Sequence, residues 1–395
     1  MTVKQWVPIG LTYCLGVLAF TSFGSMGPLA KDFGAAVHVS AQNAGSTFSF
    51  LFFPMLMAAG IGWASDRIGT RPILLFGAAC LFIDNIANLK VDSLSWLMAD
   101  NVVQGLGIIS LLVGGQTALA QMTSGKTQAG VMALWATAAG VGQSLGSLLS
   151  GNLADKAVWR LCFVVEGTAA LCLAIAALLF IQPRTAAAAA AAHRGSFGEL
   201  LGESKVLRLC LAYTLFTALS VGATSAWPFY LSRIHNVPIG EIGKMAALAA
   251  PAAIAGSVAI GYLLAQSVIP RNVVLTYIAV ALVSVPFLYS AGTDLRIVTL
   301  SMILWQFCRG SLNAFIYMML PRFIINKRNI GTATGVLNNA AALASIGAVP
   351  LFFWIAVLNQ ASIIFIALTT TCLVCSALVT PVWRLTGGPQ SQPTQ

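Results

Sequence analysis

The sequence predicts an all-α membrane protein with twelve transmembrane helices in two pseudo-symmetric six-helix bundles. Of its 395 residues, 58% are apolar and only 8% are charged, and the mean hydropathy is +0.86. A soluble domain carries about 25% charged residues, so this chain has too few charges to cover a surface in water. Two further observations predict the class: the apolar residues gather in segments of membrane-crossing length, and short motifs recur between the two halves.

A transmembrane helix needs about 20 mostly apolar residues. The segments that meet this requirement are 6–29, 43–63, 72–89, 94–121, 128–151, 159–181, 207–231, 240–265, 272–290, 297–321, 331–357 and 362–383. The first is long for a signal-peptide core and lacks a small-residue cleavage site, so we expect a retained helix. We expect an N-terminal six-helix bundle at 1–181, a cytoplasmic central loop at 182–205, and a C-terminal bundle with a short cytoplasmic tail at 206–395.

Lysine and arginine predict the orientation, because cytoplasmic loops carry an excess of both. With the N-terminus inside, thirteen of them fall on the cytoplasmic side and seven on the outer side. This favours a multi-pass protein of the cell (inner) membrane with both termini in the cytoplasm. The same bias explains the net charge of +10 without a nucleic-acid partner. The eight cysteines lie in apolar runs and form neither a disulfide framework nor a zinc pattern.

The two halves of the chain repeat. Val103-Gln104-Gly105 matches Cys308-Arg309-Gly310 at an offset of 205 residues. Gly130-Val131-Met132 matches Gly335-Val336-Leu337 at the same offset. Two matches at one offset indicate a duplication, and duplicated halves around a central cavity are a recurring plan of transporters.

The loop after the second segment carries the most specific motif. It reads Gly62-Trp63-Ala64-Ser65-Asp66-Arg67-Ile68-Gly69-Thr70-Arg71-Pro72. It resembles the glycine-x-x-x-aspartate-arginine-x-glycine-x-arginine signature of the major facilitator superfamily, and the twelve segments and long central loop extend the resemblance over essentially the whole chain.

The resemblance implies that this loop latches the cytoplasmic side shut. Asp66 would face the N-terminus of the 331–357 helix, whose free N–H groups attract an anion. Arg67 and Arg71 would hold the loop by ion pairs, although Arg67 also fits a plain topology charge. Gly62 and Gly69 would permit close approach and a tight turn.

Other signatures of the family are altered. The pattern arginine-x-x-glutamine-glycine-x-glycine begins here with Asn101, in place of the arginine often linked to proton coupling. The antiporter motif glycine-proline-x-x-glycine-glycine reads Gly146-Ser147-Leu148-Leu149-Ser150-Gly151. These departures weaken the interpretation as a standard drug/proton exporter without excluding it.

Arg309 is the most unusual residue of the chain. It lies 13 residues from Arg296 and 12 from Pro321, which puts it near the middle of the membrane, where an ionisable group is a functional candidate. Gln306, Asn313 and Tyr317 share its helical stripe.

A second polar stripe runs along the 207–231 segment. It consists of Tyr213, Thr217, Ser220, Thr224 and Trp227. By resemblance, the first, fourth, seventh and tenth helices line the cavity, and Asn101, Gln104 and Asn338 would add to the substrate-binding set. The alternative is that these residues only make helix–helix hydrogen bonds.

Three acids lie at membrane depth: Asp84, Asp100 and Glu166. A buried carboxylate can take up a proton from one side of the membrane and release it to the other, so all three are proton-coupling candidates. Asp100 ranks first because it lies on an expected cavity helix. For Asp84 and Glu166 the alternative is an ion pair with Lys90, Lys156 or Arg160. Arg309 itself could pair with Asp100.

The sequence therefore favours a secondary active transporter that moves a small anionic or polar organic solute by alternating access, with proton coupling. Its partners would be the solute, protons and the lipid bilayer, and we expect a monomer without cofactor or metal. The alternative is a drug/proton antiporter that exports apolar or cationic compounds. A remoter one is a non-transporting receptor or assembly factor. No nucleophile–base or metal-ligand spacing indicates an enzyme.

Overall fold

The computed structural model describes residues 3–123, 125–182, 203–265, 270–323, 330–358 and 361–380, although the side chains of Asp66 and Arg67 are outside the description. A chain in lipid must satisfy its backbone hydrogen bonds internally, so the apolar segments become helices. The first half contains α1 (Val3–Ala36), α2 (Ala41–Thr47), the 3-10 turns η1 (Phe48–Phe52) and η2 (Pro54–Met57), α3 (Ala58–Ile68), α4 (Thr70–Asn88), α5 (Leu94–Met122), α6 (Gly125–Asp155) and α7 (Leu161–Phe180). The second contains α10 (Ser204–Ile234), α11 (Ile239–Ala265), α12 (Pro270–Leu288), α13 (Leu295–Phe323), α14 (Ile330–Ile355) and α15 (Ala361–Val379).

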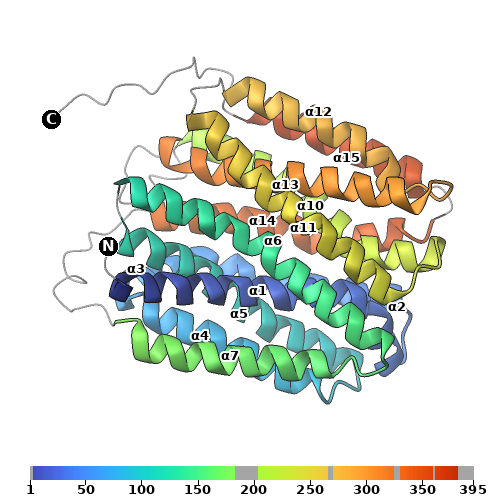
Figure 1. Cartoon of the computed structure of the whole chain (residues 1–395), viewed down its shortest axis with the longest axis horizontal. Helices are drawn as coiled ribbons and strands as arrows, with labels where there is room; N and C mark the ends of the chain where they lie inside the picture. The colour runs from blue at the N-terminus through green and yellow to red at the C-terminus, as the bar shows by residue number, and fades with distance from the viewer. Residues whose placement is uncertain are drawn as a thin grey trace.

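Each of the twelve predicted segments is helical in the described part of the chain, which confirms the fold class. The helices run lengthwise side by side in Figure 1, with α1–α7 below α10–α15. α6 packs on α11, α3 on α14 and α1 on α10, and these contacts join the two halves.

The second segment differs from the continuous helix that its composition predicts. It runs through α2, η1, η2 and α3, with Pro54 at the start of the second 3-10 turn. Proline has no N–H and its ring clashes with the preceding turn, so it breaks regular helical bonding. The break matters for the site because η1 faces the other half of the molecule, where it packs on α14.

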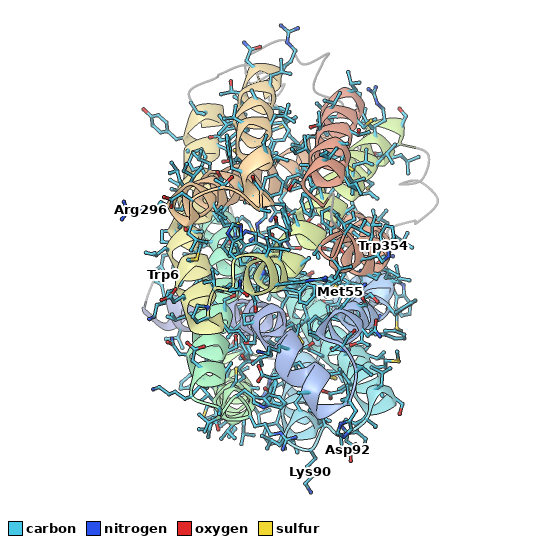
Figure 2. All side chains as sticks on the ribbon, turned by 90° about the vertical axis from the view of Figure 1, so that its right-hand side faces the viewer. Trp6, Met55, Lys90, Asp92, Arg296 and Trp354 are labelled. Carbon is cyan, nitrogen blue, oxygen red and sulfur yellow. The ribbon has the colours of Figure 1, made fainter. Side chains whose placement is uncertain are left out.

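The surface of the helical bundle exposes many large apolar side chains, as expected for contact with lipid. α7 exposes a long apolar face, on which Leu179 is 71% exposed. Ten helical segments of the described chain are long and apolar enough to cross a membrane. Exposed tryptophans mark both ends of the bundle: Trp6 and Trp63 at one end, Trp96 and Trp354 at the other. Such aromatic belts are typical of the two membrane interfaces. Figure 2 looks along the helices, with Lys90, Asp92 and Arg296 at the periphery.

The first repeated motif has a packing counterpart in each half. A Cβ on Gly105 of α5 would lie 2.0 Å from the carbonyl oxygen of Leu51 in η1, and a Cβ on Gly310 of α13 would lie 2.0 Å from that of Ala253 in α11. The two glycines let equivalent helices approach equally closely in each half. The second pair has no such likeness, since Gly335 packs against Ala59 whereas Gly130 meets nothing within 4 Å.

Candidate functional site

Arg309 lies halfway along α13, and its guanidinium reaches across to the other half of the molecule. Its Nη2 donates a hydrogen bond of 2.6 Å to Oε1 of Gln143 on α6. Among the residues that the structure describes, no carboxylate pairs with it, and the expected alternative of an ion pair with Asp100 is wrong. The Gln143 amide is neutral and leaves the charge of the guanidinium unbalanced, and it accepts from one nitrogen, so Arg309 keeps N–H donors for another acceptor.

A polar cluster with residues from three helices lies next to Arg309, in the direction of the C-terminal end of α13. The Tyr213 hydroxyl of α10 donates to Oδ1 of Asn313 at 3.1 Å and lies 3.2 Å from the Tyr317 hydroxyl. The Tyr317 hydroxyl also donates to Oδ1 of Asn338 on α14 at 3.2 Å. The side chain of Gln116 on α5 contacts Tyr317 from the first half. Four predicted binding residues are thus brought together, and the cluster joins α10, α13 and α14.

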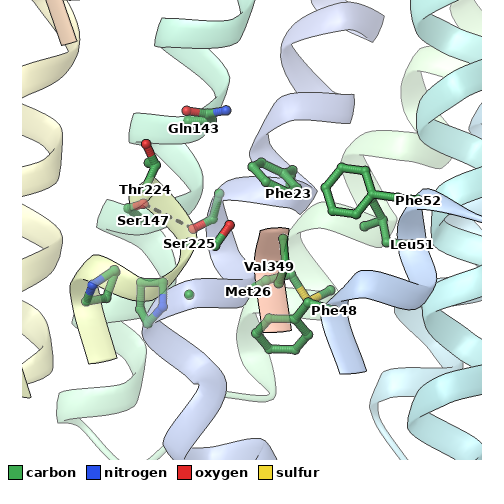
Figure 3. Close-up of a pocket in the computed structure, with 14 residues that line it drawn as sticks. Phe23, Met26, Phe48, Leu51, Phe52, Gln143, Ser147, Thr224, Ser225 and Val349 are labelled. Carbon is green, nitrogen blue, oxygen red and sulfur yellow. Dashed lines mark hydrogen bonds between the residues drawn. The ribbon is translucent and has the colours of Figure 1, made fainter. Parts of the chain in front are cut away.

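A narrow pocket lies between the two halves, and Gln143, the partner of Arg309, forms part of its wall (Figure 3). α1, η1 and α6 of the first half and α10 and α14 of the second supply its walls. The labelled side chains in Figure 3 place Phe23 and Phe52 opposite Thr224, Ser147 and Ser225. The lining is Phe23, Gly24, Met26, Gly27, Pro28, Phe48, Leu51, Phe52, Gln143, Ser147, Thr224, Ser225, Pro228 and Val349. None of these side chains carries a charge.

The remaining residues of the predicted stripes are spread over several environments. Thr224 lines the pocket, and its buried hydroxyl has no hydrogen-bond partner among the described residues. Trp227 is buried, and so are Thr217, Ser220 and Gln306. The 207–231 stripe therefore touches the polar cluster at Tyr213 and the pocket at Thr224.

Asn101 and Gln104 point into the first half. Nδ2 of Asn101 donates to the carbonyl of Thr47 at 3.3 Å, and Nε2 of Gln104 donates to that of Ser22 at 3.4 Å. Gln104 thus bonds within its own half, whereas its repeat mate Arg309 bonds across the interface. Both amides pack α5 against its neighbours.

The three acids lie inside the first half, away from Arg309. The carboxyl groups of Asp84 on α4 and Asp100 on α5 lie next to each other. Nδ2 of Asn88 donates to Oδ1 of Asp84 at 3.0 Å. Two carboxyl groups can share a hydrogen bond only if one of them carries a proton. The two carboxyl groups are therefore placed where they could share one proton.

Glu166 has its own set of partners. Its Oε1 accepts a hydrogen bond of 2.5 Å from Ser25 and one of 3.3 Å from the Cys162 thiol. The ion pair with Arg160 that the sequence left open is not formed. Arg160 instead donates to the carbonyl of Val91 at 3.3 Å and lies 5.1 Å from the centre of the Trp159 ring.

The loop motif is described in part. Gly69 connects α3 to α4 at φ 90°, a left-handed conformation that favours glycine. Nη2 of Arg71 donates a hydrogen bond of 2.5 Å to the carbonyl of Leu178 in the last turn of α7. No acid pairs with Arg71 among the side chains that the structure describes, which do not include Asp66. Gly62 is buried in α3, which packs on α14. The contacts expected of Asp66 and Arg67 lie outside the described side chains.

Of the residues that line the pocket, the sequence-based set contains Thr224 alone, and it does not contain Gln143. Gln143 is an amide in the middle of an apolar segment, which is a usable signal, but the segment was not among those expected to line a cavity. The aromatic wall gives no signal, because phenylalanines at helical spacing also face lipid or core.

Comparison with known proteins places these features in a family. Residues 9–349 match the profile of the Major Facilitator Superfamily. The solved structure of the human organic anion transporter MFSD10 (TETRAN) superposes with a TM-score of 0.69 over 96% of this chain and 98% of that chain, at 17% identity. This likeness concerns the fold.

Curated relatives match over shorter stretches. The multidrug transporter MdfA of Yersinia pestis bv. Antiqua (strain Angola) is 28% identical over 120 residues, which is 30% of this chain and 29% of that protein. The efflux pump apf11 of Gibberella fujikuroi is 27% identical over 166 residues, 40% of this chain and 28% of that protein. The chain thus aligns with less than a third of each of these two relatives. The family profile, in contrast, matches most of the length of this chain. The chain therefore belongs to the Major Facilitator Superfamily, a family of membrane transporters.

Proposed function

We propose that the chain is a secondary active transporter of a small organic anion. The observation that carries this proposal is the Arg309 guanidinium, which reaches from the second half to the first. Among the described residues, the Gln143 amide at 2.6 Å is its one hydrogen-bond partner. Guanidinium binds carboxylate or phosphate through paired N–H donors and does not lose its charge. The polar cluster around Tyr213 and Tyr317 and the pocket beyond Gln143 lie on either side of it.

Proton coupling through the Asp84–Asp100 pair is the second part of the proposal. The pair can hold one proton or release it, and the mutual repulsion of two ionised carboxylates would then force a rearrangement between α4 and α5. Glu166, bonded to Ser25 and Cys162, is the other candidate.

Alternating access is the third part. The pocket has walls from both halves, so rocking of the N-terminal bundle (1–181) against the C-terminal bundle (206–395) would open it to one side at a time. The loop at Gly62–Arg71 would act as the inner latch. In this proposal the protein works as a monomer in the inner membrane, with the loop 182–205 and both termini in the cytoplasm.

Export of apolar or cationic compounds is the second candidate. It is favoured by the uncharged lining of the pocket, which includes three phenylalanines. It is also favoured by the similarity to the multidrug transporter MdfA and the efflux pump apf11. It is disfavoured by Arg309, which repels a cation and has no acid beside it among the described residues.

A thermal-shift screen of the purified full-length chain separates the two candidates. The panel would contain anionic, neutral and cationic compounds of similar size. We expect stabilisation by anions and its loss in Arg309→Gln. Stabilisation by cationic or neutral compounds alone would contradict the anion proposal and support the efflux one.

A further inference from the structure

We propose that the transported solute is an amphipathic monoanion: its one anionic group replaces Gln143 on Arg309, and its compact apolar part enters the pocket between Phe23, Phe52 and Thr224. This inference rests on the proposed function and adds the class of solute, as well as a role for Gln143. It starts from the position of that amide, which is bonded to Arg309 and also lines the pocket. One solute can therefore reach both sides of it.

The pocket itself limits the charge of the solute to one. Its fourteen lining residues include no cation, so a second carboxylate placed there would lose its hydration without gaining a partner. Burial of an unpaired ion is strongly unfavourable. Phe23, Phe48 and Phe52 offer an apolar surface that suits a ring or a branched chain, and Phe23 and Phe52 already pack edge to face with centres 6.0 Å apart.

One neutral polar group of the solute has a place. The Thr224 hydroxyl lines the pocket and is buried without a partner among the described residues, whereas the neighbouring Ser147 hydroxyl donates to the carbonyl of Gly24 at 3.0 Å. A buried hydroxyl without a partner is costly. A hydroxyl, keto or amide group on the apolar part of the solute would satisfy Thr224.

Gln143 occupies the place on the Arg309 guanidinium that the anion would take. In this conformation it neutralises none of the charge of Arg309 and satisfies one N–H of the guanidinium. A carboxylate accepts two parallel N–H bonds and brings the opposite charge, so it competes favourably with a single amide oxygen. Because Gln143 belongs to α6 and Arg309 to α13, this exchange also releases a bond between the two halves. Binding of the anion is thereby linked to their relative movement.

The probes are 3-phenylpropanoate, its neutral amide, and glutarate, with binding measured by calorimetry on the full-length protein in lipid nanodiscs. We expect 3-phenylpropanoate to bind at least about tenfold more tightly than the other two. Phe52→Ala should weaken 3-phenylpropanoate about tenfold and leave acetate unchanged, because acetate carries no apolar part.

Two substitutions of Gln143 test the exchange. Gln143→Glu supplies a permanent counter-ion to Arg309 and should weaken 3-phenylpropanoate at least about tenfold. Gln143→Leu removes the amide oxygen that competes for Arg309. This variant should bind 3-phenylpropanoate as tightly as the unmodified chain or more tightly. Helical circular dichroism and a monodisperse elution profile would establish that each variant is folded.

The outcomes separate this inference from the proposed function. If no anion binds to the folded unmodified protein, or if Arg309→Gln binds anions normally, the proposed function itself fails. If anions bind through Arg309 but glutarate binds as well as 3-phenylpropanoate, or Gln143→Glu binds normally, only the amphipathic solute and the exchange at Gln143 are overturned.

Discussion

The carboxylate of Asp155, the last residue of α6, accepts a hydrogen bond of 2.9 Å from the backbone N–H of Gly240 in the first turn of α11. The two residues belong to different halves of the molecule. The first N–H groups of a helix have no partner within it and carry a partial positive charge, so an acid there is stabilising. The family resemblance of the Gly62–Arg71 loop implies an acid–helix contact of this kind for Asp66, and the Asp155–Gly240 contact lies at the other end of the bundle.

The first prediction concerns the contact of Asp155 with Gly240, which the proposed topology places on the outer side. Asp155→Ala should favour opening of the pocket to the outside by about two- to fivefold, because an acid at a helix N-terminus contributes about 0.3–1 kcal/mol. The measurement is the rate at which a membrane-impermeant thiol reagent, added from outside, labels a cysteine introduced at Thr224. The rate for the chain without that cysteine is subtracted.

Asp155→Asn is the matched control, because it keeps an acceptor oxygen for Gly240 and loses only the charge. In this variant, the thiol reagent should label the cysteine at position 224 faster than in the chain with Asp155 and more slowly than in Asp155→Ala. Equal labelling of all three chains would contradict a closing role for this contact.

The second prediction concerns proton coupling. In proteoliposomes, a proton gradient with the acidic side outside should stimulate uptake of the solute by the unmodified chain. Asp100→Asn should abolish this stimulation, whereas exchange of the solute at equal pH on both sides should continue. An amide at position 100 still hydrogen-bonds to Asp84 but cannot release a proton. Solute-induced alkalinisation of the external medium, followed with a pH-sensitive dye, gives a direct readout.

Glu166→Gln serves as the comparison for that experiment. Its partners Ser25 and Cys162 can bond an amide as well as a carboxylate. If Glu166→Gln loses the pH stimulation and Asp100→Asn keeps it, coupling lies at Glu166 and not in the Asp84–Asp100 pair.

The third prediction concerns close packing in the second half. A methyl group on Gly310 would lie 2.0 Å from the carbonyl oxygen of Ala253, which belongs to a helical backbone and cannot turn away. Gly310→Ala should therefore destabilise the protein by about 1–3 kcal/mol. The measurement is the midpoint of thermal unfolding in detergent. Gly347 meets nothing within 4 Å, so Gly347→Ala should leave the midpoint unchanged or raise it. Equal midpoints for the two variants would contradict the packing argument.

The sequence was sufficient for the fold class and for part of the site. Length and apolar content locate each membrane segment, and the spacing of Asn313 and Tyr317 on one helix face predicts that they meet the same neighbours. They do meet in the cluster around Tyr213. Position along a helix is readable because the rise per residue is fixed, so Arg309 could be placed near mid-membrane.

Contacts between helices were harder to predict. The rotation of α5 decides that Asp100 faces Asp84 within the first half and not the interface, and no periodicity of one helix contains that information. The pairing of Gln143 with Arg309 depends on how the two halves approach each other. The 3-10 turns around Pro54 reshape the wall of the pocket through a break that apolar content alone does not reveal.

Counterflow exchange by Arg309 variants tests the central claim most directly. Proteoliposomes containing the full-length chain are preloaded with 3-phenylpropanoate, and uptake of the labelled compound is measured at equal pH on both sides. Because a carboxylate at mid-membrane needs a permanent cation with paired donors, Arg309→Gln should reduce exchange to the level of empty liposomes, and Arg309→Lys should retain a part of it. Exchange by folded Arg309→Gln at the rate of the unmodified protein would contradict the claim that Arg309 binds the solute.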